Sequence, residues 1–121
     1  MVHTASFSLD ATDRGPAILT LDGEFDRSEG PQFEQRMAEA LDSGRTGVVV
    51  DLRGVSFLDP TMVLALVRGL RRAEKRNGLG SLHLVRPNPI VWRTFVLTGV
   101  SATFPAFPTL RDALATFTPR S

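Results

Sequence analysis

The spacing of hydrophobic residues changes along this chain, and the changes mark the predicted strands and helices. Short alternating runs at Ala5–Leu9 and Ala17–Leu21 predict two strands, and the turn residues Asp13–Pro16 between them indicate an antiparallel hairpin. From Ser28 to Leu41 the apolar residues recur every three or four positions, which predicts a helix with one buried face. That face consists of Phe33, Met37, Ala40 and Leu41.

The rest of the chain alternates between strand and helix patterns. Val48–Leu52 is an apolar run interrupted by Asp51, which is typical of a central strand covered on both faces. Pro60–Arg76 follows as an amphipathic helix that stops at Asn77–Gly78. The later predicted elements are a strand at Leu82–Val85, a helix between the cap Asn88 and Gly99 with Val91, Phe95 and Val96 facing inward, an extended piece at Phe104–Phe107, and a last helix capped by Thr109.

This order of elements predicts an α/β fold. A mixed β-sheet of four to five strands carries about four helices, and the strand–helix–strand units imply parallel neighbours with right-handed crossovers. A length of 121 residues is enough for one core, so we expect one domain spanning residues 1–121.

The amino-acid composition excludes several classes of function for this protein. Hydrophobic residues make up 42% and charged residues 22% of the chain, as in ordinary globular proteins, and the net charge of +1 gives no field that attracts nucleic acid. The absence of cysteine excludes disulfides, thiol catalysis and zinc–thiolate sites, and it fits a reducing cytoplasm. No secretory signal and no apolar run near the roughly 20 residues of a membrane helix is evident, so we expect no membrane insertion.

Three residues in the predicted elements carry chemistry that a site could use. Asp51 in the central strand is interpreted as a polar group bonded to a neighbouring loop, because no second carboxylate lies at catalytic spacing. His83 lacks ligand spacing and is predicted on the sheet surface. Trp92 either marks an interface or covers the edge of the core. No phosphate loop or nucleophile elbow is present, so we expect no metal, no cofactor and no enzymatic activity.

Charge is unevenly distributed over the two long predicted helices. The exposed face of the second helix is opposed only by Glu74 and carries Arg68, Arg71, Arg72, Lys75 and Arg76. This face either docks an acidic partner or is a solvated surface whose late cations complement the helix dipole, and it lacks the interleaved aromatics of a nucleic-acid site. The region from Glu24 to Asp42 is mainly acidic, so it could steer a partner or self-association, and it could equally be ordinary surface.

Several short motifs occur along the sequence in an order that resembles a known family. GEFD (Gly23–Asp26) is followed by DLRGVSFLD, a long helix, a glycine-containing turn, NP with a helix ending in TGV, and then FPAF. In this order the chain resembles the STAS domain of bacterial anti-sigma factor antagonists, nearly from end to end. The resemblance implies a small cytoplasmic protein with a mixed sheet and helices mainly on one face. It also implies binding to an anti-sigma factor, often a serine kinase, and release of a sigma factor.

The resemblance also implies a switch, and here this sequence departs from the family. The usual switch is phosphorylation of a serine directly after the aspartate that corresponds to Asp59, and Glu24 and Asp26 of GEFD help to meet the kinase. In this chain the serine position is Pro60, which has no hydroxyl, and Met62 replaces the usual glycine. Thr61 is the possible phosphosite, one residue further on. We favour loss of the standard switch.

The bend at the start of the second helix is therefore the predicted recognition site. Asp59 is also expected to cap the helix, with Pro60 at its first turn. The predicted partner-binding residues are Glu24, Asp26, Arg27, Ser28, Asp59, Pro60, Thr61, Met62 and Arg68. Alternatives are an accessory or scaffold subunit of a lipid transporter or stress-signalling complex, and a nucleotide sensor. A homodimer is compatible with either.

Overall fold

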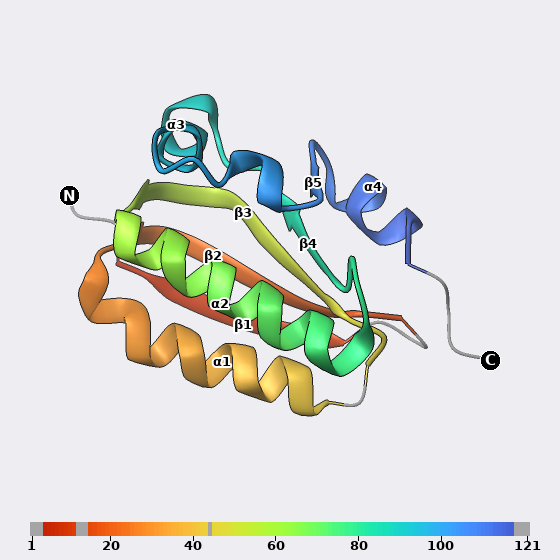
Figure 1. Cartoon of the computed structure of the whole chain (residues 1–121). Helices are drawn as coiled ribbons and strands as arrows, with labels where there is room; N and C mark the ends of the chain where they lie inside the picture. Colours follow the sequence, from red (N-terminus) through yellow and green to blue (C-terminus); the bar gives the residue numbers. More distant parts are fainter. Residues whose placement is uncertain (1–3, 12–14, 44, 118–121) are drawn as a thin grey trace.

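Five strands form one mixed sheet in the computed structural model, which describes residues 4–11, 15–43 and 45–117 (Figure 1). The strand order is β1-β2-β3-β4-β5, with β1 antiparallel to β2 and every other pair parallel. The strands are β1 (Ser6–Ala11), β2 (Ala17–Phe25), β3 (Val48–Leu58), β4 (Leu82–Val85) and β5 (Ala106–Phe107). The helices are α1 (Gly30–Asp42), α2 (Pro60–Asn77), α3 (Pro89–Leu97), α4 (Leu110–Ala115) and the short 3-10 helices η1 (Arg27–Glu29) and η2 (Ser101–Thr103).

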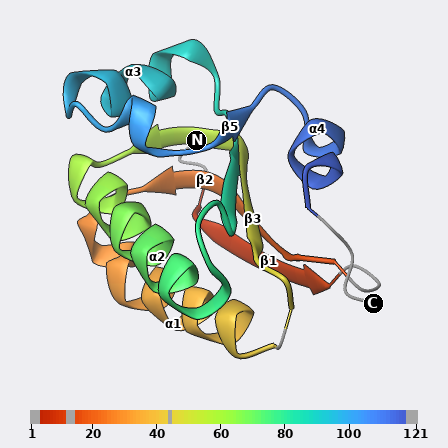
Figure 2. The same ribbon diagram turned by 45° about the vertical axis from the view of Figure 1, so that its right-hand side comes forward.

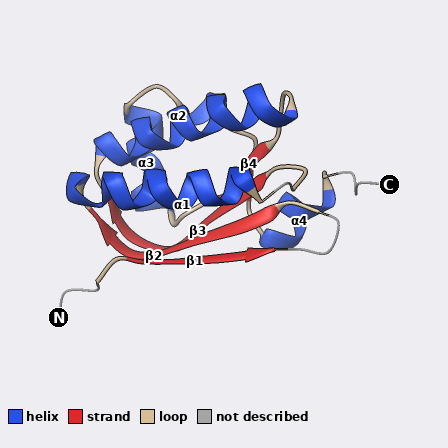
Figure 3. Cartoon of the chain, turned by 90° about the horizontal axis from the view of Figure 1, so that it is seen from below, coloured by secondary structure: helices blue, strands red, loops and turns tan. Residues whose placement is uncertain are grey.

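The helices are divided unequally between the two faces of the sheet. Figure 3 shows α1 and α2 along one face, and the core on that face also contains Val91 and Phe95 of α3. A smaller cluster around Val49, Val85 and Ala113 holds α4 against the other face. Because side chains alternate along a strand, Val48 and Val50 of β3 face the large core while Val49 faces α4. The predicted mixed sheet with helices mainly on one face is confirmed, and the hairpin is too, although its predicted turn at Asp13–Pro16 lies partly outside the described residues.

The central strand is longer than its hydrophobic run. β3 was predicted over Val48–Leu52, but it extends to Leu58, because β2 continues beside it and pairs Phe25 with Leu58. A register shift accommodates the polar stretch between these points, and Gly54 lies where a Cβ would come within 2.7 Å of the Asp22 carboxylate. The backbone pairing of β3 with β2 therefore continues beyond Leu52, where the continuous run of buried residues ends.

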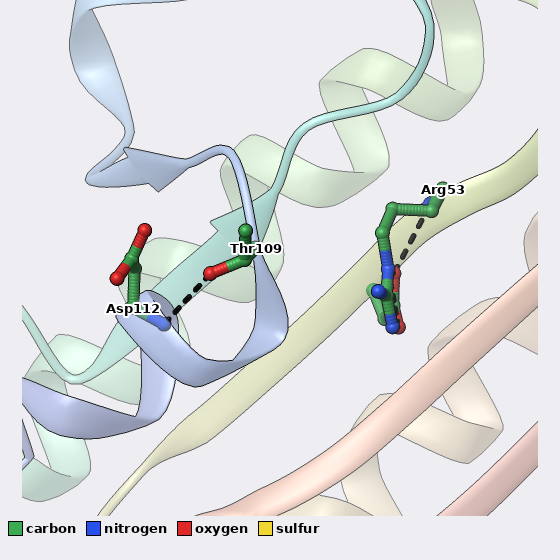
Figure 4. Close-up of polar contacts among 4 residues, drawn as sticks. Arg53, Thr109 and Asp112 are labelled. Carbon is green, nitrogen blue, oxygen red and sulfur yellow. Dashed lines mark hydrogen bonds and ion pairs between the residues drawn. The ribbon is translucent and has the colours of Figure 1, made fainter.

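The expectations for Asp51 and Val96 were wrong. The Asp51 carboxylate is buried and binds Arg53 on the same strand, at 2.7 Å between Oδ2 and Nη2, rather than a neighbouring loop (Figure 4). Residues two apart on a strand share a face, so this pair forms within β3 itself. Val96 is 54% exposed, because it follows the inward-facing Phe95 by one residue and is rotated about 100° around α3.

His83 is not a surface residue, because α4 covers it. Its ring lies 5.0 Å from that of Phe107 and 4.1 Å from that of Phe117, measured between centroids. Its Nδ1 lies 2.9 Å from the carbonyl oxygen of Ala113. The predicted cap of α4 is present, since the Thr109 hydroxyl accepts a hydrogen bond from the Asp112 amide (Figure 4). His83 therefore helps to attach the last helix to the sheet.

Two neighbouring residues of α2 provide a test of this packing. Met62 is fully buried whereas Leu64 is 50% exposed. We expect Met62→Ala to lower the free energy of unfolding by about 2–5 kcal/mol through loss of transfer energy and formation of a cavity. The control Leu64→Ala changes it by about 0.5 kcal/mol. Urea denaturation followed by circular dichroism measures both, and equal losses would contradict the assigned orientation of α2.

Candidate functional site

The candidate site lies where two paired parallel strands end together. β2 ends at Phe25 and β3 at Leu58, and the Asp59 amide donates to the Phe25 carbonyl at 2.8 Å. The chain then turns at Asp26 into η1 and α1, and at Asp59 into α2 (Figure 1). The carboxyl ends of parallel strands share one edge of a sheet, so the two aspartates flank the same corner. We call Asp26, Ser28, Asp59 and Thr61 the acidic corner.

The two turns of the acidic corner are built in the same way. The Asp59 carboxylate accepts hydrogen bonds from the Thr61 amide at 2.8 Å and the Thr61 hydroxyl at 2.7 Å. The Asp26 carboxylate accepts from the Ser28 amide at 2.8 Å and from the Ser28 hydroxyl. In each case an aspartate caps the following helix and also orients a hydroxyl two residues later. The predicted capping role of Asp59 is confirmed.

These hydrogen bonds lower the pKa values of both aspartates. The amide and then the hydroxyl of Thr61 lower the pKa of Asp59, and the positive charge of Arg27 lowers it further, against opposing rises from desolvation and from the charge of Asp26. The pKa of Asp26 is lowered by the hydroxyl and then the amide of Ser28. Each hydrogen bond favours the charged form of the carboxylate. The acidic corner therefore presents two negative charges at the surface at physiological pH.

Pro60 begins α2 directly after the turn at Asp59 and does not disturb the helix. It is exposed at the first position of α2, where an amide hydrogen has no intrahelical partner and the fixed φ of proline suits the helix. Thr61, also exposed, supplies the only hydroxyl in the sequence Asp59–Met62. The bend is thus preset in one shape by a cap and a proline.

Met62 does not belong to the contact surface, which corrects the prediction. It is fully buried, because it faces the sheet together with Leu66 one turn later, so a visiting protein does not reach it. The sequence alone placed it in the exposed turn. The structure instead brings together Asp26, Arg27, Ser28, Asp59, Pro60 and Thr61.

Glu24 and Arg68 lie apart from the corner. Glu24 is half-buried on β2 beside Phe57, and strand alternation puts it on the face opposite the large core. Arg68 lies two turns along α2, where its guanidinium is 3.2 Å from a carboxylate oxygen of Glu34 on α1. Both stay predicted contacts, at the margin of the corner.

Acidic residues of α1 also form ion pairs with the cations near the end of α2. Arg72 lies 3.2 Å from Glu34, and Arg76 lies 2.6 Å from Asp42. The opposite charges of the two helices therefore pair within one molecule. These exposed pairs add little stability, but they reduce the positive face that the sequence suggested.

Two exposed apolar residues near the corner were missed by the sequence reasoning. Phe57 is 47% exposed and lies two residues before Asp59, and Leu64 is 50% exposed one helical turn after Pro60. The available signal was that Leu64 falls outside the apolar stripe of Val63, Leu66, Leu70 and Ala73. An apolar residue beside a charged corner is typical of a binding surface.

Other kinds of site are not found in the described part of the chain. No group of three or more histidine or acidic residues is placed to hold a metal ion there. Over the same residues, none of the helices has the length and apolar character needed to cross a bilayer.

The capping hydrogen bonds predict how the corner responds to acid. The folded pKa of Asp59 lies below its usual value of 3.8, so the caps contribute stability above that pH and lose it as the pH falls through the folded pKa. We expect the NMR signal of the Asp59 carboxyl carbon to titrate with a midpoint below 3.8. Thr61→Val removes one donor and shifts the midpoint upward, and an unchanged midpoint would contradict the hydroxyl's role.

Comparison with known proteins identifies the family. The sequence profile described as "Mlab, STAS domain" matches residues 8–112. The chain is 30% identical over 104 residues to the anti-sigma-F factor antagonist RsfB of Mycobacterium tuberculosis (strain CDC 1551 / Oshkosh), covering 86% of this chain and 83% of RsfB.

Solved structures agree with this match. An anti-sigma factor antagonist from Mycobacterium paratuberculosis superposes with a TM-score of 0.79 at 28% identity, covering 91% of each chain. The anti-sigma factor antagonist SpoIIAA in its unphosphorylated form gives a TM-score of 0.73 at 23% identity, covering 89% of this chain and 92% of that one, which supports the fold alone. The chain belongs to the STAS domain family and is homologous to anti-sigma factor antagonists.

Proposed function

We propose that this protein is an anti-sigma factor antagonist, which binds an anti-sigma factor of the serine-kinase type in the cytoplasm and so releases a sigma factor. The homology to RsfB supports the antagonist role. The acidic corner is the main support for the position of the binding surface. It presents two ionised carboxylates in turns whose shape is set before binding. The protein acts by binding and catalyses no reaction.

Pre-organisation makes this corner suitable for recognition. The carboxylates of Asp26 and Asp59 are already held by hydrogen bonds, and Pro60 restricts the backbone directly after Asp59. A surface that is ordered before binding loses less conformational entropy when the partner arrives. Exposed Phe57 and Leu64 supply apolar contacts at its margin, and the exposed charges guide the encounter.

We further propose that this domain lacks the standard phosphoserine switch. SpoIIAA has been solved in an unphosphorylated and in a phosphorylated form, so phosphorylation is a state of that protein. Pro60 offers no acceptor at the equivalent position, and Thr61 is rotated by about 100° around the helix. The Thr61 hydroxyl also donates to Asp59, so a phosphate of about −1.5 to −2 charges there would lie against a carboxylate. The corner then binds its partner constitutively.

The charge of Asp59 is the first test of the binding surface. Asp59→Asn keeps a good N-cap residue and removes the charge. We expect the affinity for the anti-sigma factor, measured by isothermal titration calorimetry, to fall about tenfold while the melting temperature changes little. The control is Asp112→Asn on α4, which neutralises an exposed aspartate in the first turn of a different helix. Equal effects of the two substitutions would refute a specific role of the corner.

The state of the switch is tested with the kinase and ATP. After incubation of the protein with the serine-kinase-type anti-sigma factor of the same organism and ATP, intact mass analysis should show no added phosphate. Pro60→Ser, which supplies an exposed hydroxyl at the first position of α2, should gain one phosphate at residue 60. A phosphate on Thr61 of the unaltered protein, abolished by Thr61→Val, would overturn the proposed loss of the switch.

A further inference from the structure

Helix α3 is apolar on the side that faces solvent as well as on the side that faces the core. Ile90 is 82% exposed, Leu97 is 73% exposed and Val96 is 54% exposed, whereas Val91 and Phe95 are buried. Ile90, Arg93 and Leu97 follow one another at helical spacing and form one outer stripe. A helix that remains apolar on its outer face is typical of an interaction surface.

A groove adjoins the start of this stripe. It has a volume of about 320 Å³ and is lined by Arg86, Pro87, Pro89, Trp92 and Pro108. The indole of Trp92 stacks on Phe95 with 4.6 Å between ring centroids, so its position is fixed by the core. Proline rings also lose little freedom on binding, because their φ angles are already set. The groove is therefore a preformed apolar slot with a guanidinium at its edge.

The chain segment that contains α3 carries cations but no acidic residue. The sequence contains no aspartate or glutamate from Lys75 to Arg111, a stretch that includes five cations: Lys75, Arg76, Arg86, Arg93 and Arg111. Arg86 and Arg93 are exposed, and neither makes an ion pair with the residues that the structure describes. The α3 surface, defined as α3 with Arg86, Pro87 and Pro108, thus combines apolar contacts with uncompensated positive charge.

These features select one kind of partner. A two-fold contact of this surface with a second copy would place Arg86 and Arg93 near the same cations of the partner copy, which is unfavourable. A flat bilayer does not fill a slot walled by prolines, whereas a side chain of a protein segment does. Carboxylates on that segment complement the arginines.

We propose that the α3 surface docks an acidic protein segment whose apolar anchor side chain enters the groove over Trp92 while its carboxylates face Arg86 and Arg93. α3 lies beside the start of α2 (Figures 1 and 2), so this positive surface borders the negative acidic corner. Opposite charges require different partner segments at the two surfaces. The docking role therefore goes beyond the proposed function and does not depend on it.

Selection from a random 12-residue peptide library on the immobilised full chain tests this docking role. We expect enrichment of peptides that carry Asp or Glu within a few residues of Leu, Phe or Trp. A synthetic peptide of the enriched sequence should shift the amide NMR signals of the non-proline residues from 86 to 97, and leave those of Asp26, Ser28, Asp59 and Thr61 unchanged. A failure of the proposed antagonist function at the acidic corner would leave this result intact.

Substitutions with matched controls locate the contact. Ile90→Asp and Arg86→Glu should each lower the peptide affinity about tenfold, because they add negative charge to the surface and both side chains are exposed enough to leave the fold intact. The controls are Leu79→Asp, at a site 93% exposed after α2, and Arg71→Glu on the outer face of α2, which should have no effect. Equal losses in the controls would overturn the assignment.

Other occupants give other results, and each would overturn the proposal. Co-sedimentation with phosphatidylcholine–phosphatidylglycerol vesicles (3:1), lost in Ile90→Asp, together with no peptide enrichment would assign the surface to a membrane. A concentration-dependent dimer in analytical ultracentrifugation, lost in Ile90→Asp, would assign it to a second copy. Enrichment of peptides without carboxylates would refute the role of the arginines.

Discussion

The parallel pairing of β2 with β3 is the constraint on which the rest of the molecule depends. The ladder runs from Ala17 beside Val48 to Phe25 beside Leu58, and the Asp59 amide closes it on the Phe25 carbonyl. This pairing carries the central strand beyond its apolar run and brings two helix starts to one edge. The acidic corner is the direct consequence, because each strand is followed at once by a capping aspartate.

Charges are separated on this scaffold rather than spread evenly. Acidic residues of α1 bind cations of α2, so the long helices largely neutralise each other at the surface where they meet. The negative acidic corner and the positive α3 surface lie outside these ion pairs. The net charge of +1 conceals this division. Local charge, and not total charge, therefore describes what the molecule can recognise.

The same carboxylates serve the fold and the surface. Asp26 and Asp59 satisfy amides at helix starts, and this internal use both fixes their orientation and lowers their pKa values. A proline at the first helical position adds stiffness without the loss of a hydrogen bond. Rigidity at the acidic corner thus arises from ordinary helix capping, and its shape does not depend on a phosphorylation switch.

The sequence by itself determined the order of elements, the mixed sheet, the family and the caps at Asp59, Asn88 and Thr109, because periodicity and capping depend on residues close in the chain. Only the tertiary structure decided the length of β3, the cover of α4 over His83, and the ion pairs between α1 and α2. It also moved Met62 from the predicted surface to the core. The first three features depend on segments distant in sequence that meet only when the sheet is assembled, so local patterns contain no signal for them. For Met62 the one-turn spacing to the apolar Leu66 was a local signal.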